Sequence, residues 1–334
     1  MAHLLDRRRF ISIAASAAGM ALLPSGASAK DMQTVTWEGR ALGAAARMTL
    51  HHPERRAAEE LIRQAVVETE RLERIFSLYR PDSALSELNR VGALAMPPTE
   101  LVAVLETSRD VWNLTDGAFD PTVQPLWTLL ADHFGRAKPD PSGPPRERLG
   151  EALQRVGLDK VAFSASRIAF TRVGMALTLN GIAQGFITDR IVDLLRRGGV
   201  TKTLVDMGEI RTIGLRPDGS PWTVGIEDPR HEGGLATVLE VEDKAVATSS
   251  GEGFRFDAAG RFNHLIDPRS GLGALRYRSV AVVAPDATSA DALSTAFSLL
   301  EPDEVRRIVK RRPGLRAYLF DRSKPVAPLV FEAG

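Results

Sequence analysis

The sequence of 334 residues contains no cysteine. Disulfides therefore contribute nothing to its stability, and a lipidated N-terminal cysteine cannot anchor it to a membrane. An excess of charge of one sign is also missing, since 43 Lys and Arg residues nearly balance 42 Asp and Glu residues. Nucleic-acid binding relies on excess Lys and Arg, so this balance argues against a nucleic-acid partner. The 44% of hydrophobic residues is ordinary for a globular protein with an apolar core.

Long hydrophobic runs are missing as well, apart from one short run near the N-terminus. Residues 11–23 form an apolar stretch of 13 residues, too short to span a bilayer core of roughly 30 Å as a helix. It follows Arg7-Arg8-Arg9 and precedes Ala27-Ser28-Ala29, which is typical of a twin-arginine signal peptide with an Ala-x-Ala cleavage site. An uncleaved N-terminal anchor is the alternative.

We therefore predict a signal peptide over residues 1–29 and a mature domain over residues 30–334. The mature chain is expected in the bacterial periplasm, exported by the twin-arginine route and without stable insertion in a membrane. Loss of three Arg and one Asp with the signal peptide changes the formal net charge from +1 to −1. The remaining 305 residues suffice for one large domain or two closely packed lobes.

Hydrophobic periodicity predicts both helices and strands. Helices are expected over residues 53–76, 99–114 and 185–197, after Thr288 and after Pro302. Strands are expected within residues 32–52 and 160–180, over 203–206, 211–215, 222–227, 236–241, 245–248 and 280–284, and near 315–320. The proline-rich residues 138–145 are expected to be a surface loop. Long helices together with grouped antiparallel strands predict an α+β fold.

A candidate metal motif lies near the C-terminus. Thr288 is placed to cap a helix in which Asp291 and Thr295, four residues apart, share one face. A carboxylate and a hydroxyl in this arrangement can hold a small hard cation such as Mg²⁺. Thr-x-x-Asp is also the capping box, which needs no metal. Upstream, His264 begins the turn His-Leu-Ile-Asp-Pro-Arg-Ser-Gly, and the two motifs together suggest a metal, a base and a phosphate-bearing ligand.

Several other segments are rich in Gly, Asp, Ser and Thr between apolar stretches. They are residues 76–83, 117–125, 179–185, 248–251 with 264–271, and 291–295. Each alone has an ordinary structural interpretation. Tyr79 can be a core aromatic residue, Asp120 can accept hydrogen bonds from its own turn, and His264 can be a structural histidine. Gly181 to Gly185 resembles a phosphate-binding loop at a helix start, but such glycine pairs are common.

Together and in this order, the segments resemble the ApbE family of FAD:protein FMN transferases, from residue 41 to about 317. The most specific pieces are Gly-Ala-Phe-Asp-Pro-Thr-Val, Gly-Ile-Ala-x-Gly, Asp206-Met-Gly-Glu-Ile-Arg, His-Leu-Ile-Asp-Pro-x-Ser-Gly and Ala290-Asp-Ala-Leu-Ser-Thr. The resemblance implies two packed α/β lobes with largely antiparallel sheets and a flavin cleft between them. It also implies Mg²⁺ as cofactor and FAD as substrate, whose FMN half is attached through a phosphoester to a Thr or Ser of an acceptor flavoprotein with release of AMP.

The resemblance also implies roles for individual residues. Metal ligands are expected at Gly181, Asp291, Ser294 and Thr295, and His264 matches the position proposed for a base. Flavin contacts are expected at Leu42, Tyr79, Ala118, Phe119, Asp120, Thr178, Gln184 and Ile266. Ser249, Ser250 and the backbone near Gly251 are further candidates, as donors to phosphate oxygens.

Two residues depart from the family pattern, which usually has Asp at Thr178 and often Lys at Gln184. These changes put the retention of FAD in doubt but leave the metal pair and the histidine in place. The signal peptide with this Asn-Gly-Ile-Ala-Gln-Gly sequence resembles the NosX-like subgroup, which implies a NosR-like membrane acceptor in nitrous oxide respiration. The alternatives are a non-catalytic periplasmic flavin donor and a solute-binding protein, although the latter requires two repeated parallel lobes.

Overall fold

The computed structural model describes residues 32–227, 234–323 and 327–333. The predicted signal peptide, residues 1–29, lies outside the described residues, so its presence stays a prediction. Within the described ranges, no helix combines the length and the apolar character that crossing a membrane requires.

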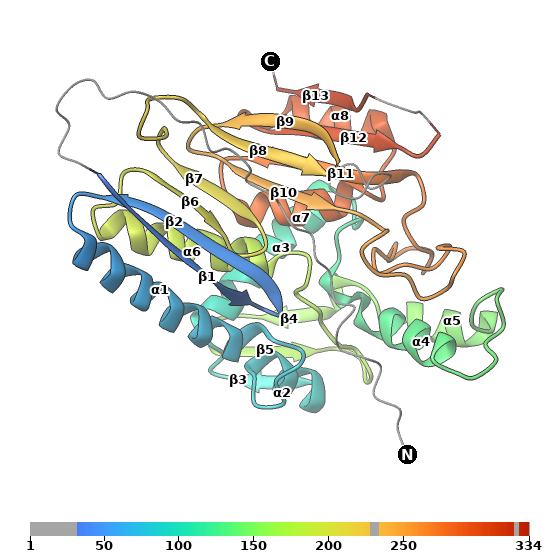
Figure 1. The fold of residues 1–334 in the computed structure, drawn as a ribbon. Helices are drawn as coiled ribbons and strands as arrows, with labels where there is room; N and C mark the ends of the chain where they lie inside the picture. Colours follow the sequence, from blue (N-terminus) through green and yellow to red (C-terminus); the bar gives the residue numbers. More distant parts are fainter. Residues whose placement is uncertain (1–31, 228–233, 324–326, 334) are drawn as a thin grey trace.

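An antiparallel sheet of eight strands forms the centre of the structure (Figure 1). Its strand order is β1-β2-β6-β7-β10-β11-β12-β13, and each neighbouring pair is antiparallel. The strands are β1 (Gln33–Ala41), β2 (Ala44–His52), β6 (Thr203–Asp206), β7 (Ile210–Ile213), β10 (Ala245–Ser249), β11 (Tyr277–Ala284), β12 (Arg316–Asp321) and β13 (Leu329–Glu332). This sheet together with the long helices confirms the α+β prediction and contradicts the parallel lobes of a solute-binding protein.

The two faces of this sheet are covered differently. Helices α1 (Arg55–Phe76), α6 (Ala183–Arg197) and α7 (Ala287–Phe297) cover one face and share the main hydrophobic core with it. The hairpin of β8 (Trp222–Glu227) and β9 (Leu235–Val241) covers the other and forms a second core. Alternation along β11 serves both, because Val280 and Val282 enter the main core while Ala281 and Val283 enter the second.

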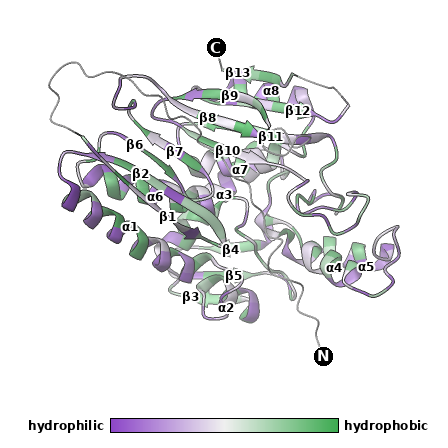
Figure 2. Cartoon of the chain, in the orientation of Figure 1, coloured by the Kyte–Doolittle hydropathy of each residue, from purple (hydrophilic) through white to green (hydrophobic). Residues whose placement is uncertain are grey.

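Helix α1 shows how the sequence pattern produces this packing. Its buried residues recur three or four positions apart, as in Ala58, Ile62 and Ala65, so they form one apolar stripe facing the sheet. Figure 2 shows the hydrophilic and hydrophobic colours alternating along this helix. Helices α3 (Thr99–Leu114) and α8 (Pro302–Lys310) bury similar stripes. These helices were all expected from the sequence.

Two smaller units are attached to this core (Figure 1). One consists of α2 (Ala84–Val91) and a three-stranded sheet in the order β3 (Ala93–Ala95), β5 (Arg167–Phe170) and β4 (Val161–Phe163). The other is the hairpin of α4 (Gln124–Phe134) and α5 (Arg146–Leu153), which has its own hydrophobic cluster. The predicted surface loop, residues 138–145, connects α4 to α5.

Several predictions of local structure were wrong. Helices α2, α4 and α5 and strand β13 were not expected, and the strands expected up to residue 180 end at Phe170. Thr288 does not cap α7. The helix begins two residues earlier than expected, and Asp286 is the cap, whose side chain accepts a hydrogen bond from the Ser289 amide. Asp291 therefore lies in the second turn of α7 and not in its first.

Candidate functional site

Helices α6 and α7 cross very closely at Gly185. A Cβ atom at this position would lie 2.2 Å from the carbonyl oxygen of Ala287 and 2.9 Å from Cβ of Asp291. Only glycine can therefore occupy this position without a shift of the backbone. The Gly185 amide donates a hydrogen bond of 3.0 Å to Oδ2 of Asp291, which leaves the other carboxylate oxygen available to a ligand.

Gly181, just before α6, makes a second close approach. A Cβ atom there would lie 2.9 Å from Oγ1 of Thr295. At the end of β10, Oγ of Ser249 lies 2.7 Å from Oγ of Ser294 and 3.4 Å from Oγ1 of Thr295. The structure therefore places the four predicted metal ligands around one stretch of α7, and it adds Ser249 to the group.

The electrostatics of this region are unfavourable for an anion. Asp291 is only 4% exposed, and burial together with the nearby Asp189 raises its pKa to about 7, although the Gly185 hydrogen bond opposes the shift. Glu209 is buried beside it, and its pKa is raised by burial and by Asp291 and Asp206. No basic side chain in the described ranges contributes to the pKa of Asp291, so a bound cation would relieve the repulsion among these carboxyl groups.

The oxygen atoms at this crossing suit a hard cation. In the part of the chain that the structure describes, no cluster of three or more His, Cys, Asp or Glu side chains is arranged to hold a metal. A cation here would thus rely on the Asp291 carboxylate with hydroxyl and backbone oxygens. Carboxylate, hydroxyl and carbonyl oxygens are ligands that Mg²⁺ accepts, usually with retained waters and substrate phosphates.

The predicted flavin residues converge on the same loop before α6. The hydroxyl of Tyr79 hydrogen-bonds the side chain of Asn180, and the Thr178 amide donates a bond of 2.8 Å to the carbonyl oxygen of Pro121. These contacts bring residues 76–83 and 117–125 to the loop that carries Gly181. Tyr79 remains 60% exposed, so its ring face is accessible to a planar ligand.

Asp120 has a structural role that the sequence also allowed. Its Oδ1 accepts from the amide and the hydroxyl of Thr122, at 2.8 and 2.6 Å. Its Oδ2 accepts from Nε1 of Trp112 and the amide of Leu158, both at 3.0 Å. These four donors occupy both carboxylate oxygens, so a flavin contact here would have to come from the backbone of residues 118–120.

The remaining flavin candidates contact other parts of the fold. The side chain of Gln184 packs on Gly208, since a Cβ atom added at Gly208 would lie 2.3 Å from Nε2 of Gln184. Leu42 has a left-handed backbone, with φ of 47°, and its amide donates to the Glu73 carboxylate. Ala118 and Phe119 are buried in the main core. Ile266 is buried in the α4–α5 cluster and forms a bridge with Gly273.

A backbone contact sets the tautomer of His264. Its Nδ1 lies 3.2 Å from the carbonyl oxygen of Phe254, and because a carbonyl can only accept, this contact fixes the proton on Nδ1. Nε2 of the neutral ring is then the proton acceptor. Burial lowers the pKa of His264 below its ordinary value, so the ring is largely neutral at pH 7.

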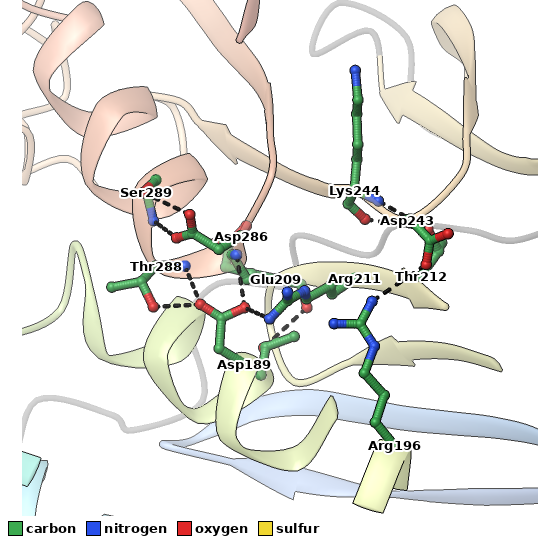
Figure 3. Close-up of polar contacts among 12 residues, drawn as sticks. Asp189, Arg196, Glu209, Arg211, Thr212, Asp243, Lys244, Asp286, Thr288 and Ser289 are labelled. Atoms are coloured by element: carbon green, nitrogen blue, oxygen red, sulfur yellow. Dashed lines mark hydrogen bonds and ion pairs between the residues drawn. The ribbon is translucent and has the colours of Figure 1, made fainter. Parts of the chain in front are cut away.

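Sequence reasoning missed an ion pair beside the site. Figure 3 shows Asp189 of α6 between Arg211 of β7 and the first turn of α7. Nη1 of Arg211 lies 2.5 Å from Oδ1 of Asp189. Asp189 follows Gly185 by four residues and so lies on the same face of α6. That spacing was the available signal, and Arg211 belongs to the quoted Asp206–Arg211 motif.

Comparisons with known proteins identify the family of the chain. The profile of the ApbE family matches residues 42–319. An FAD:protein FMN transferase of Treponema pallidum (strain Nichols) is 33% identical over 276 residues, which cover 76% of this chain and 75% of that protein. One of Escherichia coli (strain K12) is 26% identical over 309 residues, covering 90% of this chain and 87% of that protein.

Solved structures show the same fold. The apo form of the Pseudomonas stutzeri flavinyl transferase ApbE superposes with a TM-score of 0.77 at 26% identity, covering 90% of this chain and 95% of that one. The flavin transferase ApbE from Vibrio cholerae has a TM-score of 0.77 at 24% identity, covering 91% and 98%. Because the family profile spans most of its length, the chain belongs to the ApbE family.

Proposed function

We propose that this protein is an FAD:protein FMN transferase that uses Mg²⁺ bound where α6 crosses α7. The observation that carries the proposal is the convergence of Gly181, Asp291 and Thr295 at this crossing, in a chain that the ApbE profile matches over residues 42–319. The relatives that share this match are named for that activity. Asp291, Thr295 and the backbone at Gly181 would hold the metal, with Ser294 beside them.

The reaction is a phosphoryl-type transfer. A threonine or serine oxygen of the acceptor forms a bond to the FMN phosphorus of FAD, the diphosphate bond breaks, and AMP leaves. Bound Mg²⁺ supplies charge neutralisation on the diphosphate oxygens. His264 accepts the hydroxyl proton at Nε2, while its Nδ1–H stays bonded to Phe254. The hydroxyl of Ser249, at the end of β10, lies beside this group. The Ser250 hydroxyl instead donates to the carbonyl oxygen of Arg278, so its proton is already used within the protein.

We further propose the compartment and the acceptor. The pattern over residues 7–29 supports export by the twin-arginine route and action in the periplasm. The acceptor would be a periplasmic flavoprotein domain with a target threonine or serine, of the NosR-like kind that serves nitrous oxide respiration. FAD is the small-molecule partner in this scheme.

The test is direct observation of the covalent product. The purified protein is incubated with FAD, Mg²⁺ and a candidate acceptor domain, and the acceptor is examined by mass spectrometry for an added FMN and by in-gel flavin fluorescence. Matched controls replace the target threonine of the acceptor by valine or replace Mg²⁺ by EDTA. A covalent product that needs both the threonine and the metal supports the proposal. Flavin that binds but never becomes covalently attached, while a known transferase modifies the same acceptor, would favour the non-catalytic flavin donor instead.

A further inference from the structure

Helices α6 and α7 contact each other at three regularly spaced levels. Gly181 approaches Thr295, Gly185 approaches Asp291 and Ala287, and Asp189 accepts from the amides of Ala287 and Thr288. Each level is four residues further along α6 and four residues back along α7, so the helices run antiparallel in one constant register. Four residues rise roughly 6 Å along a helix, which puts Asp189 about one turn from the level of Asp291 and about two turns from the level of Gly181 and Thr295.

The first two levels leave no room for a side chain on α6, but few hydrogen bonds fix the helices there. At both of them a glycine allows the backbone to come close, and among the residues that the structure describes the hydrogen bond from the Gly185 amide to Asp291 is the polar contact between the two helices there. The third level is different because several bonds meet on one carboxylate (Figure 3). Oδ1 of Asp189 lies 2.8 Å from the Ala287 amide and 2.5 Å from Nη1 of Arg211, and Oδ2 lies 2.9 Å from the Thr288 amide and also accepts from its hydroxyl.

Asp189 therefore joins three elements. Its own helix α6, the first turn of α7 and strand β7 all meet at this side chain, which is 14% exposed. Charge-assisted hydrogen bonds are the strongest and most direction-dependent polar contacts in proteins. A slide of α7 along α6 by a single residue, about 1.5 Å, would break the three bonds that α7 donates to Asp189.

Asp286 provides a contrast at the same helix end. It also accepts from α7, through the amide of Ser289 at 2.7 Å and its hydroxyl at 3.0 Å, but it belongs to the turn that leads into α7. Asp286 can thus stabilise the first turn of α7, yet it cannot fix where α7 lies along α6. Two aspartates bind one helix end, and only one of them connects it to another helix.

We propose that Asp189, paired with Arg211, is a positioning residue that sets the register of α7 on α6 and so keeps Gly181 opposite Asp291 and Thr295. Asp189 itself touches neither metal nor substrate. This inference rests on the proposed function, which places the metal at the crossing. Mg²⁺ demands near-ideal geometry at 2.0–2.1 Å from its ligands, so a small shift in register weakens metal binding before it affects the chemistry.

The test compares Asp189→Ala with Asp286→Ala. For each variant and the wild type, flavin transfer is measured over a range of Mg²⁺ concentrations, and Mn²⁺ binding in the presence of FAD is followed by electron paramagnetic resonance without any acceptor. Asp189→Ala is expected to raise the half-saturating Mg²⁺ concentration about tenfold, as is usual when a partner behind the metal ligands is lost, with kcat at saturating Mg²⁺ largely retained. Mn²⁺ binding should weaken by a similar factor. Asp286→Ala should lower the melting temperature and leave both metal readouts unchanged.

Two further variants keep the test informative. If Asp189→Ala does not fold, Asp189→Asn and Arg211→Lys replace it, and both should give smaller shifts in the same direction because part of the contact remains. Equal metal dependence in the Asp189 and Asp286 variants would overturn the inference. A wild type that binds Mn²⁺ but transfers no flavin would overturn the proposed function alone, since the binding data would still decide the role of Asp189.

Discussion

The two faces of the central sheet are built on different principles. The face under the β8–β9 hairpin is sealed mainly by apolar residues, among them Trp222, Val224, Leu239 and Phe320. The face under α6 and α7 adjoins buried polar groups, including Asp291, Ser294 and Glu209. Both faces belong to the same strands, so the difference lies in the side chains and not in the backbone.

This difference separates stability from chemistry. Burial of apolar surface stabilises the fold, at about 25 cal/mol per Å². Burial of a carboxyl group without a cation costs free energy and raises its pKa, as at Asp291, where the pKa reaches about 7. Buried polar groups that do not stabilise the fold are concentrated where α6 meets α7. We therefore expect substitutions near this crossing to reduce activity and substitutions under the β8–β9 hairpin to reduce stability.

The largest effect on activity is expected at His264. His264→Ala should lower kcat by roughly 10²–10⁴-fold, the usual contribution of a general base, while FAD still binds, because the ring accepts the proton of the attacking hydroxyl. Stopped-flow transfer rates and FAD titration provide the two measurements. Loss of FAD binding together with the rate would show that His264 contacts the ligand and is not the base.

The largest effect on stability is expected on the opposite face. Phe320→Ala removes a ring that is 7% exposed in the second core and should lower the free energy of unfolding by about 3–5 kcal/mol. Because the change lies across the sheet from the site, kcat measured well below the melting temperature should stay within a factor of two. Denaturant unfolding and transfer assays check both parts. A large drop in kcat for the folded variant would contradict the separation of the faces.

Asp291→Asn should move activity and stability in opposite directions. Asparagine is a weaker metal ligand, so the Mg²⁺ concentration for half-maximal transfer should rise by about 10–100-fold. At pH 8 the wild-type carboxyl is ionised in a buried position, and its neutral replacement should raise the melting temperature. An unchanged metal requirement would remove Asp291 from the site.

The sequence predicted the helices and strands that bury a regular apolar stripe. It failed for the elements and caps whose position depends on tertiary contacts. Helix α1 and strand β11 were predicted because their apolar spacing has a clear period. The short helix α5 lacks such a pattern, because Ala152 is its only buried residue. Its position is fixed by packing on α4. Thr288 fits a capping box by spacing, yet its hydroxyl binds Asp189 from another helix, a contact that no local pattern contains.

The candidate site divides in the same way. The motifs named the proposed metal ligands, because Asp291 and Thr295 share a helix face at any tertiary arrangement. They could not show that Asp120 would be occupied by four donors, one of them from Leu158, or that Asp189 would join α6 to α7. Such roles depend on which elements become neighbours, and nearby sequence does not encode that directly.

The smallest effect is expected at Asp206, the last residue of β6. Burial raises the pKa of Asp206 to about 6, although the Gly208 amide and Arg47 oppose the shift. A carboxyl whose folded pKa lies above its unfolded value of about 3.9 favours the folded state at low pH. That contribution is complete below pH 4 and is lost as the pH rises through 6.

Asp206→Asn cannot ionise and can still accept from the Gly208 amide, at 2.9 Å in the wild type. The variant should therefore be more stable than the wild type by about 1–2 kcal/mol at pH 8, and this difference should shrink towards zero near pH 4.5. Urea unfolding at both pH values measures it, with Asp218→Asn in an exposed turn as a matched control. A stability difference that stays the same at both pH values would mean that burial does not raise the pKa of Asp206. The buried polar region would then not include the end of β6.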